Sequence, residues 1–420
     1  MVGIDLHRRI RRCESAPALA VCVLTLLMAP AIPASADAGT PSAPTVIMIS
    51  LDGTTYPQIE RADLEWIPKL MRRGATAKRL VPVFPSNTFP NHVSLITGVP
   101  PEVHGIVNNA FLDPDRGEYD YDADPTWLEV EPLWAIAARH GVVSASYHWV
   151  GSEGAWRNGW GPRHWEKFDS GTREAKKVEK ILEWLDLEDP AERPRLITAW
   201  FHGADGAGHR SGPDSKRVTN DLREQDLAIG ELVAGLEARD AFSHTTLLLV
   251  SDHGMLEVER SIDLEDLIDD AGIDARVVGG GGFAIVYTDG DAARARRVVE
   301  IARANGLEAH RPAEAPSELR LGHVRFGDVV VVPPPGTSMH SSFFRRAVVS
   351  GAHGYRPETP GMSAIFIAFG RAAPAGATYG VARTIDVAAT VLDWLGIAPP
   401  EWMEGRPLAP NVASGEAASR

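Results

Sequence analysis

The stretch TLLLVSDHGM at residues 246–255 joins an apolar run to two ionisable residues, and this combination indicates the fold. A short apolar run bounded by polar residues is typical of a buried strand. The same kind of run recurs along the chain, and helical patterns separate the runs. The predicted strands are 46–51, 142–147, 196–201, 246–251 and 364–369, and the predicted helices are 67–73, 176–185, 215–239 and 381–395. Strands that alternate with helices predict an α/β sandwich around a mostly parallel sheet.

Ionisable residues stand where three of these predicted strands end. Asp52 ends the first strand, and Asp205 closely follows the third. Asp252 and His253 end the fourth. Because ligands gather at the carboxyl ends of parallel strands, we expect these side chains at one edge of the sheet. A buried strand rarely ends in Asp-His unless something neutralises the carboxylate, and a surface turn with a hydrogen-bonded aspartate is the alternative.

Two further segments carry a metal-ligand pattern. In GADGAGH at residues 203–209, Asp205 precedes His209 by four residues, which aims both side chains at one ion if the segment is helical. A capped helix start is the alternative for this pair. GAHG at residues 351–354 places His353 near the fifth strand. Taken alone, this pattern favours a plain loop histidine at position 353.

Thr88 is the candidate nucleophile. The segment SNTFPNH at residues 86–92 places its hydroxyl before an apolar stretch that predicts a helix. A hydroxyl in that position can simply cap the helix. As a nucleophile Thr88 has to lose its proton, and no His-Asp pair is obvious beside it. Coordination to a metal ion is therefore the natural means of activation.

The first 36 residues have the composition of a secretory signal peptide. Four arginines at positions 8, 9, 11 and 12 precede an apolar run from 16 to 32, and small residues at 34–36 offer a cleavage site. We therefore expect an exported protein, periplasmic or extracellular, with no membrane span after cleavage. An N-terminal membrane anchor is the alternative, but the run is short and is broken by prolines.

Cysteine content and charge limit the chemistry further. Both cysteines, Cys13 and Cys22, lie in this leader, so a metal site in the mature chain has to use His, Asp and Glu. The net charge of -14 opposes stable binding to nucleic acid. Small phosphorylated substrates are compatible with this charge if bound metal cations offset the negative field.

The order of the patterns predicts a core that is interrupted once. Between residues 260 and 344 the pattern changes to strands at 283–287 and 329–332 that flank a helix at 292–304. We predict a catalytic core at 44–259 and 346–410, a small α+β cap at 260–345, and a disordered tail at 411–420. The glycine run at 279–282 has neither the Lys nor the Ser/Thr of a phosphate loop, and it is interpreted as a flexible turn.

Six motifs, in this order and spacing, resemble the nucleotide pyrophosphatase/phosphodiesterase family of the alkaline phosphatase superfamily. They are ISLDG at 49–53, TFPNH at 88–92, HGIVNN at 104–109, Asp205 with His209, SDHGM at 251–255, and His353 with Gly354. The resemblance extends from about residue 46 to 395. It implies an alkaline phosphatase-like three-layer sandwich with the small cap as an insertion.

The resemblance also implies roles for the candidate residues. Asp205, His209 and His353 would bind one zinc ion, and Asp52, Asp252 and His253 would bind a second. Thr88 would contact the second ion and attack phosphorus. Asn109 would donate to a phosphoryl oxygen together with the backbone amide of residue 88 or 89. Phe89 and Phe168 would form the two walls of a slot for a nucleobase.

The implied activity is a two-zinc phosphodiesterase or nucleotide pyrophosphatase that acts on nucleotide-like substrates through a phosphothreonine. A phosphomonoesterase or phosphonoacetate hydrolase with the same ligands is the alternative enzyme, and a catalytically silent zinc-binding exported protein is the alternative outside enzymes. Many animal members carry lysine before the nucleophile and tyrosine after the Asn-His pair, whereas this chain has Asn87 and Val93. That departure leaves the choice of substrate open.

Overall fold

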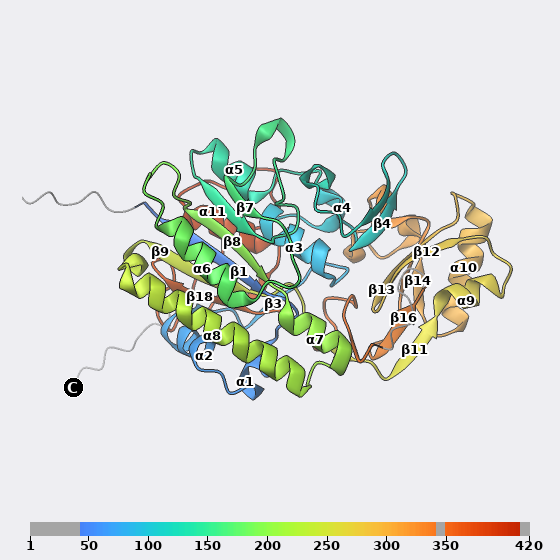
Figure 1. Ribbon diagram of the computed structural model, residues 1–420. Helices are drawn as coiled ribbons and strands as arrows, with labels where there is room; N and C mark the ends of the chain where they lie inside the picture. Colours follow the sequence, from blue (N-terminus) through green and yellow to red (C-terminus); the bar gives the residue numbers. More distant parts are fainter. Residues whose placement is uncertain (1–42, 342–348, 412–420) are drawn as a thin grey trace, which may run out of the picture. The chain divides into compact units, whose positions relative to one another are not determined.

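The computed structural model describes residues 43–341 and 349–411, and the predicted leader and most of the predicted tail lie outside these ranges. A seven-stranded sheet forms the centre, in the order β2-β18-β9-β1-β8-β6-β7 (Figure 1). Its strands are β2 (Ala75–Thr76), β18 (Phe366–Gly370), β9 (Thr245–Val250), β1 (Thr45–Leu51), β8 (Leu196–Phe201), β6 (Ser144–Tyr147) and β7 (His164–Glu166). β1, β6, β7, β8 and β9 pair in parallel, and β18 pairs antiparallel with β9 and β2. The predicted mostly parallel sheet is therefore confirmed.

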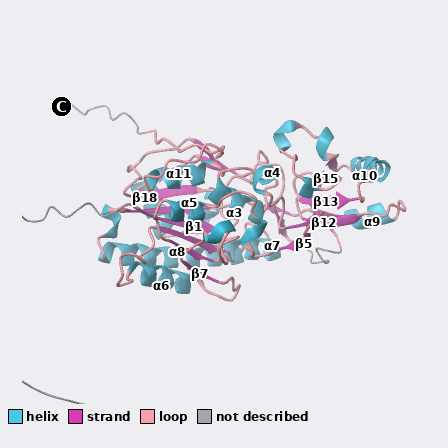
Figure 2. Cartoon of the chain, turned by 90° about the horizontal axis from the view of Figure 1, so that it is seen from above, coloured by secondary structure: helices cyan, strands magenta, loops and turns pink. Residues whose placement is uncertain are grey.

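Helices cover both faces of this sheet, as Figure 2 shows from above. Successive residues of a strand point to opposite faces, and every residue of β1 is buried. Ile47 and Ile49 pack in one core with helices α2, α6 and α8, whereas Val46 and Met48 pack in the other core with α3, α5 and α11. These helices are α2 (Trp66–Arg73), α3 (Thr88–Thr97), α5 (Leu133–Arg139), α6 (Glu174–Leu185), α8 (Lys216–Ala238) and α11 (Asp386–Trp394). The result is the predicted three-layer α/β sandwich.

Two local expectations differ from the structure. The predicted helix 381–395 begins only at Asp386, because Val381–Arg383 forms strand β19 and pairs in parallel with β3 (Arg79–Val81). The short edge strand β7 was not predicted, since three residues within a glycine-rich loop carry too little pattern. Among the helices in the described ranges, none is both long and apolar enough to cross a membrane.

A second, smaller sheet lies between β9 and β18 in the sequence. It has the order β12-β13-β15-β14, and its strands are β12 (Arg276–Gly280), β13 (Phe283–Tyr287), β15 (Val329–Val332) and β14 (Glu308–His310). Helices α9 (Leu264–Asp269) and α10 (Ala292–Ala304) pack on it around a separate apolar core. We call this α+β unit the cap. The glycine run at 279–282 spans the hairpin between β12 and β13: Gly279 and Gly280 end β12, and Gly281 and Gly282 form the turn. Gly279 and Gly281 have positive φ angles of 98° and 65°.

Candidate active site

Thr88 is the first residue of helix α3, and Asn87 is the residue that precedes it as N-cap. The first amides of a helix have no acceptor within the helix, so this end attracts an anion. The Asn91 side chain fixes the segment that precedes the helix. It accepts a hydrogen bond from the Val83 amide at 2.7 Å and donates one to the Asn87 carbonyl at 2.9 Å. The Thr88 hydroxyl lies 3.1 Å from Nε2 of His253. The structure thus presents this hydroxyl where a phosphoryl group is favoured.

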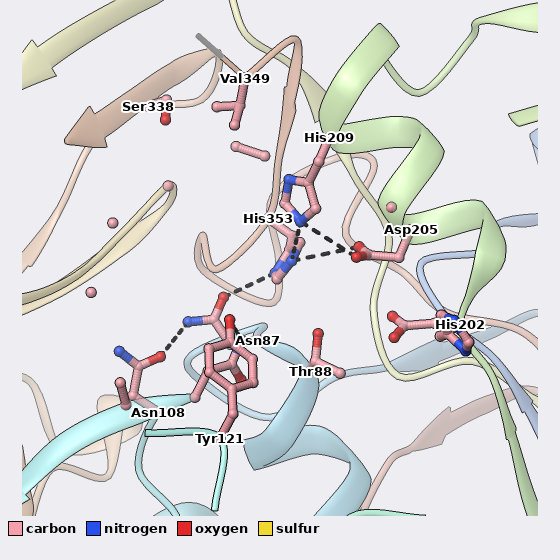
Figure 3. Close-up of a pocket in the computed structure, with 18 of the residues that line it drawn as sticks. Asn87, Thr88, Asn108, Tyr121, His202, Asp205, His209, Ser338, Val349 and His353 are labelled. Atoms are coloured by element: carbon pink, nitrogen blue, oxygen red, sulfur yellow. Dashed lines mark hydrogen bonds and ion pairs between the residues drawn. The ribbon is translucent and has the colours of Figure 1, made fainter. Parts of the chain in front are cut away.

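Asp205, His209 and His353 form the first cluster of potential ligands (Figure 3). Asp205 and His209 lie one turn apart on helix α7 (Gly203–Ser211), and His353 directly follows strand β17 (Gly351–Ala352). Nε2 of His209 lies 3.4 Å from Asp205 Oδ2, and Nε2 of His353 lies 3.6 Å from Asp205 Oδ1. The two Nε2 atoms are 3.1 Å apart.

The hydrogen bonds that Nδ1 makes in these two imidazoles fix the direction of the lone pair on Nε2. Nδ1 of His209 donates to the Gly351 carbonyl at 2.9 Å, and Nδ1 of His353 donates to Asn87 Oδ1 at 2.9 Å. A neutral imidazole that donates from Nδ1 has an acceptor at Nε2. Two such lone pairs facing each other at 3.1 Å repel unless a proton or a cation lies between them. Oriented imidazoles beside a carboxylate are the arrangement that zinc prefers.

Asp52, Asp252 and His253 meet at the carboxyl ends of the neighbouring strands β1 and β9. Nε2 of His253 lies 3.0 Å from Asp252 Oδ2 and 3.7 Å from Asp52 Oδ1, and its Nδ1 donates to the Gly254 carbonyl at 2.9 Å. The expected edge of the sheet therefore collects this second set. Ligand atoms of Asp205 also lie within 4.8 Å of those of Asp52 and His253, so Asp205 stands between the two clusters.

The two clusters form one centre. The rings of His253 and His353 stack with centroids 3.8 Å apart. In the described part of the chain, Oδ1 of Asp52 and Oδ1 of Asp205 are buried and accept no hydrogen bond. Buried carboxylate oxygens without donors are costly unless a cation compensates them. The residues present therefore fit the binding of metal ions.

Electrostatics support the same conclusion. Burial, together with the charges of Asp252 and Asp205, raises the pKa of Asp52 well above its usual value. Burial also works to raise the pKa of Asp252, but His253 and His92 outweigh it and hold that pKa well below its usual range. The buried carboxylates of Asp52 and Asp252 and the partly buried one of Asp205 carry like charge and disfavour one another, and divalent cations reverse that balance.

Asn109 lies beside the predicted nucleophile. Its Oδ1 accepts a hydrogen bond from the Phe89 amide at 2.8 Å, and its Nδ2 lies 3.3 Å from the Tyr121 hydroxyl. The amide of residue 89 is thus engaged by Asn109 itself. Nδ2 of Asn109 carries two protons, so one is left beside the contact with Tyr121, and the Thr88 amide, at the first position of α3, has no acceptor within the helix.

A cavity of about 470 Å³ is lined by residues of both clusters, and its volume is within the usual range for small-molecule sites. One side of it is aromatic and is formed by Tyr121, Phe168 and Trp200. Phe168 stacks on Trp200 with centroids 5.1 Å apart. Glycines and polar residues of the cap form another side, including Gly279, Gly280, Ser338 and His340.

The structure places the two predicted slot walls differently. Phe168 lines the cavity, but Phe89 is not among the described residues that do. The Phe89 ring is 6% exposed and meets the rings of Tyr121 and Trp200 edge-on at 5.0 and 6.3 Å. It packs against two of the rings that form the aromatic side.

Trp200 and Tyr121 were not identified from the sequence. Trp200 also donates from Nε1 to Asp52 Oδ2 at 2.8 Å, so it joins the aromatic side to the second cluster. Its position at the end of a predicted strand was a usable signal, because neighbouring strand ends share an edge. Tyr121 follows a short hairpin, β4 (Ala110–Asp113) and β5 (Gly117–Asp120), and nothing in its sequence context points to the cavity.

Phe89→Ala is expected to destabilise the protein by about 3–5 kcal/mol, the usual cost of deleting a buried phenyl ring. Because the ring lies under the cavity, catalytic losses should be similar on substrates with and without a nucleobase. Chemical unfolding and kcat/KM on the two substrate types measure both effects. A stable variant that is selectively impaired on the nucleotide substrate would restore Phe89 as a wall of the slot.

A three-layer α/β sandwich with carboxylates and imidazoles gathered around a threonine defines an alkaline phosphatase-like hydrolase of phosphoric esters. The profile of the family described as type I phosphodiesterase/nucleotide pyrophosphatase matches residues 46–356, and the chain belongs to this family. The predicted family and the predicted class of enzyme are thereby confirmed.

Individual relatives agree with this assignment. A pyrophosphatase/phosphodiesterase of Schizosaccharomyces pombe, itself uncharacterised, is 34% identical over 346 residues, which are 78% of this chain and 71% of that protein. Ectonucleotide pyrophosphatase/phosphodiesterase family member 3 of Rattus norvegicus is 35% identical over 219 residues, which are 50% of this chain but only 25% of the rat protein. The structure of murine ectonucleotide pyrophosphatase/phosphodiesterase 5, an inactive variant in complex with AMP, superposes with a TM-score of 0.78 at 23% identity. It covers 85% of this chain and 96% of the murine chain, and it supports the fold.

Proposed function

We propose that the chain is an exported two-zinc phosphodiesterase/nucleotide pyrophosphatase with Thr88 as its nucleophile. The observation that carries this proposal is the geometry around the Thr88 hydroxyl. Three imidazoles with outward-donating Nδ1 atoms and three carboxylates, two of them buried and one partly buried, converge beside it at the N-terminus of a helix. Asp205, His209 and His353 are the proposed ligands of one ion, and the second set is Asp52, Asp252 and His253.

In the proposed reaction the Thr88 hydroxyl releases its proton to water, and Oγ1 attacks phosphorus. Bound zinc ions would supply the charge that stabilises the attacking and leaving oxygens. The bond from phosphorus to the leaving oxygen breaks, which leaves a phosphothreonine. Asn109 Nδ2 and the Thr88 amide donate to the phosphoryl oxygens as their charge grows. Water then attacks phosphorus from the vacated side and gives up a proton, while the bond from phosphorus to Thr88 Oγ1 breaks and the threonine hydroxyl regains a proton. Two such displacements retain the configuration at phosphorus overall.

The aromatic side of the cavity supports the proposed substrate class. Tyr121 and Phe168 are 47% and 40% exposed, unusual for large rings, and both line the cavity. Exposed rings offer stacking surfaces for a nucleobase, whichever base it is. The proposed substrates are nucleotide diesters and nucleotide pyrophosphates. The murine structure is a complex with AMP, which is a nucleotide, and this supports a nucleotide-binding slot in the present chain.

A substrate panel tests the activity. Purified protein is compared on thymidine 5'-monophosphate p-nitrophenyl ester, bis-p-nitrophenyl phosphate, p-nitrophenyl phosphate and phosphonoacetate. We expect the highest kcat/KM on the thymidine ester and the next on the simple diester. Preference for the monoester or for phosphonoacetate would instead establish the alternative enzymes, which share the ligand set.

Phe168→Ala is expected to lower kcat/KM for the thymidine ester by roughly 5- to 150-fold, which corresponds to the 1 to 3 kcal/mol that stacking on one base contributes. The simple diester has no base and should lose clearly less. Trp402→Ala is the matched control, because Trp402 is also 40% exposed but lies outside the cavity lining described. Equal losses on both substrates would show that Phe168 holds Trp200 in place and does not contact the base.

Export and domain organisation belong to the same proposal. The composition of residues 1–36 supports cleavage and release into the periplasm or the medium. N-terminal sequencing of the protein recovered from that compartment tests it, and an intact leader in the recovered protein contradicts it. The cap at 260–345 is proposed to be a unit that covers the cavity, with the core formed by 44–259 and 346–410.

A further inference from the structure

Asn87, the residue directly before Thr88, contacts a proposed ligand of the other ion. Its Oδ1 lies 2.9 Å from Nδ1 of His353, and its Nδ2 donates to Asn108 Oδ1 at 2.7 Å (Figure 3). The side chains of all three residues are buried. A continuous chain of hydrogen bonds therefore runs from Asn108 through Asn87 to the imidazole.

Two glycines leave room for this chain of amides. A Cβ atom at Gly354 would lie 2.6 Å from Asn87 Oδ1, and one at Gly279 would lie 2.8 Å from Asn108 Nδ2. Both glycines have positive φ angles, 100° and 98°. Gly282 in the same hairpin donates to the His353 carbonyl at 2.8 Å. The glycine run of the cap thus lies against His353 and Asn108, which gives this sequence feature a physical explanation.

The direction of the hydrogen bonds decides what Asn87 does. An amide oxygen can only accept, so it holds the proton of His353 on Nδ1 and leaves Nε2 as the acceptor that faces His209 and Asp205. Asn108 Oδ1 in turn accepts from Asn87 Nδ2, which keeps the Asn87 amide from turning over. A lysine at position 87 could not serve in this way, because its ammonium has no acceptor.

We propose that Asn87 is a positioning residue that orients His353 for metal binding, and that Asn108 fixes the orientation of Asn87. This inference rests on the proposed metal site. Since the backbone of Asn87 also caps the helix that begins at Thr88, one residue sets the placement of the nucleophile relative to the first ion. Outer hydrogen-bond partners of this kind typically change metal affinity by about 10- to 100-fold.

The test compares Asn87→Leu, which has similar size but no acceptor, with Asn87→Asp, which keeps one. Zinc dissociation constants are measured by competition with a chromogenic chelator, without any activity assay. We expect the leucine variant to bind its weaker ion about 10- to 100-fold less tightly, and the aspartate variant to bind it close to wild type. Asn305→Ala, an exposed asparagine of the cap, is the control and should match wild type.

Thermal unfolding of the metal-free proteins separates positioning from a general structural role. Positioning predicts that the leucine and aspartate variants unfold close together while their zinc affinities differ. Equal zinc affinity in the leucine variant would overturn the proposal, because the Ser86 carbonyl, 3.2 Å from Nδ1, would then suffice to orient the ring. Equal losses in the leucine and aspartate variants would overturn it as well.

Two further outcomes are distinguishable. A wild-type protein that binds no zinc would refute the proposed function, whereas zinc binding that is indifferent to residue 87 would refute only this inference. If the leucine variant does not fold, Asn87→Ala replaces it in the same comparison, because alanine also removes the Oδ1 acceptor and adds no bulk.

Discussion

Replacing Thr88 by alanine is expected to lower kcat by about 10⁴- to 10⁶-fold, the scale seen when a catalytic nucleophile is removed. The hydroxyl lies 3.1 Å from His253 Nε2 at the first turn of α3, and the helix does not need it as a cap because Asn87 holds that position. Fold and zinc content should therefore change little. Single-turnover assays on the thymidine ester measure the loss.

Thr88→Ser provides the matched variant, because it restores a hydroxyl at the same backbone position and should recover part of the rate. Wild-type protein quenched during turnover should carry phosphate on Thr88, which mass spectrometry detects. Near-normal kcat in the alanine variant would show that water attacks the substrate directly, and the covalent route would then be abandoned.

Removal of bound metal is expected to reduce hydrolysis by about 10³-fold or more, since metal ions contribute several kcal/mol to such transition states. Without them, the buried carboxylates of Asp52 and Asp252 and the partly buried one of Asp205 face the phosphate. Zinc should restore activity, and elemental analysis should find about two ions per chain, because the six side chains form two sets of three.

Magnesium is the control ion in that experiment. It prefers oxygen ligands and near-octahedral geometry, so a site with three imidazoles should not regain activity with it. A single tightly held ion would contradict the two-metal proposal. Activity that survives thorough chelation would contradict any metal-dependent route.

The sequence was most informative where chemistry follows directly from topology. Once 46–51 and 246–251 are predicted as strands of one mostly parallel sheet, Asp52 and Asp252 are expected at one edge, and the structure pairs the two strands and brings both residues together with His253. Asp205 was assigned to one set only. Its position between both clusters depends on where α7 begins relative to β1, which no local pattern encodes.

The aromatic side of the cavity was the least predictable part. Phe89 follows Thr88 directly, so proximity to the reacting group was a sound expectation. Which way its ring points depends on the rotation of α3 and on the space left by Tyr119, Tyr121 and Trp200, whose rings meet it at 5.0 to 6.3 Å. Contacts between segments so far apart in the sequence cannot be recognised from any short stretch of sequence.

The return of the chain from the cap to the core bears on how the protein is made. β18 pairs with β9 although the entire cap separates them in the sequence, and His353 lies on the returning segment shortly before β18. A growing polypeptide therefore carries its carboxylates long before it carries its last imidazole. Bringing such distant segments together costs loop entropy that only the finished sheet offsets. Nascent chains that end before residue 353 lack one of the proposed metal ligands, so a chain secreted before it folds would bind metal in the compartment where it matures.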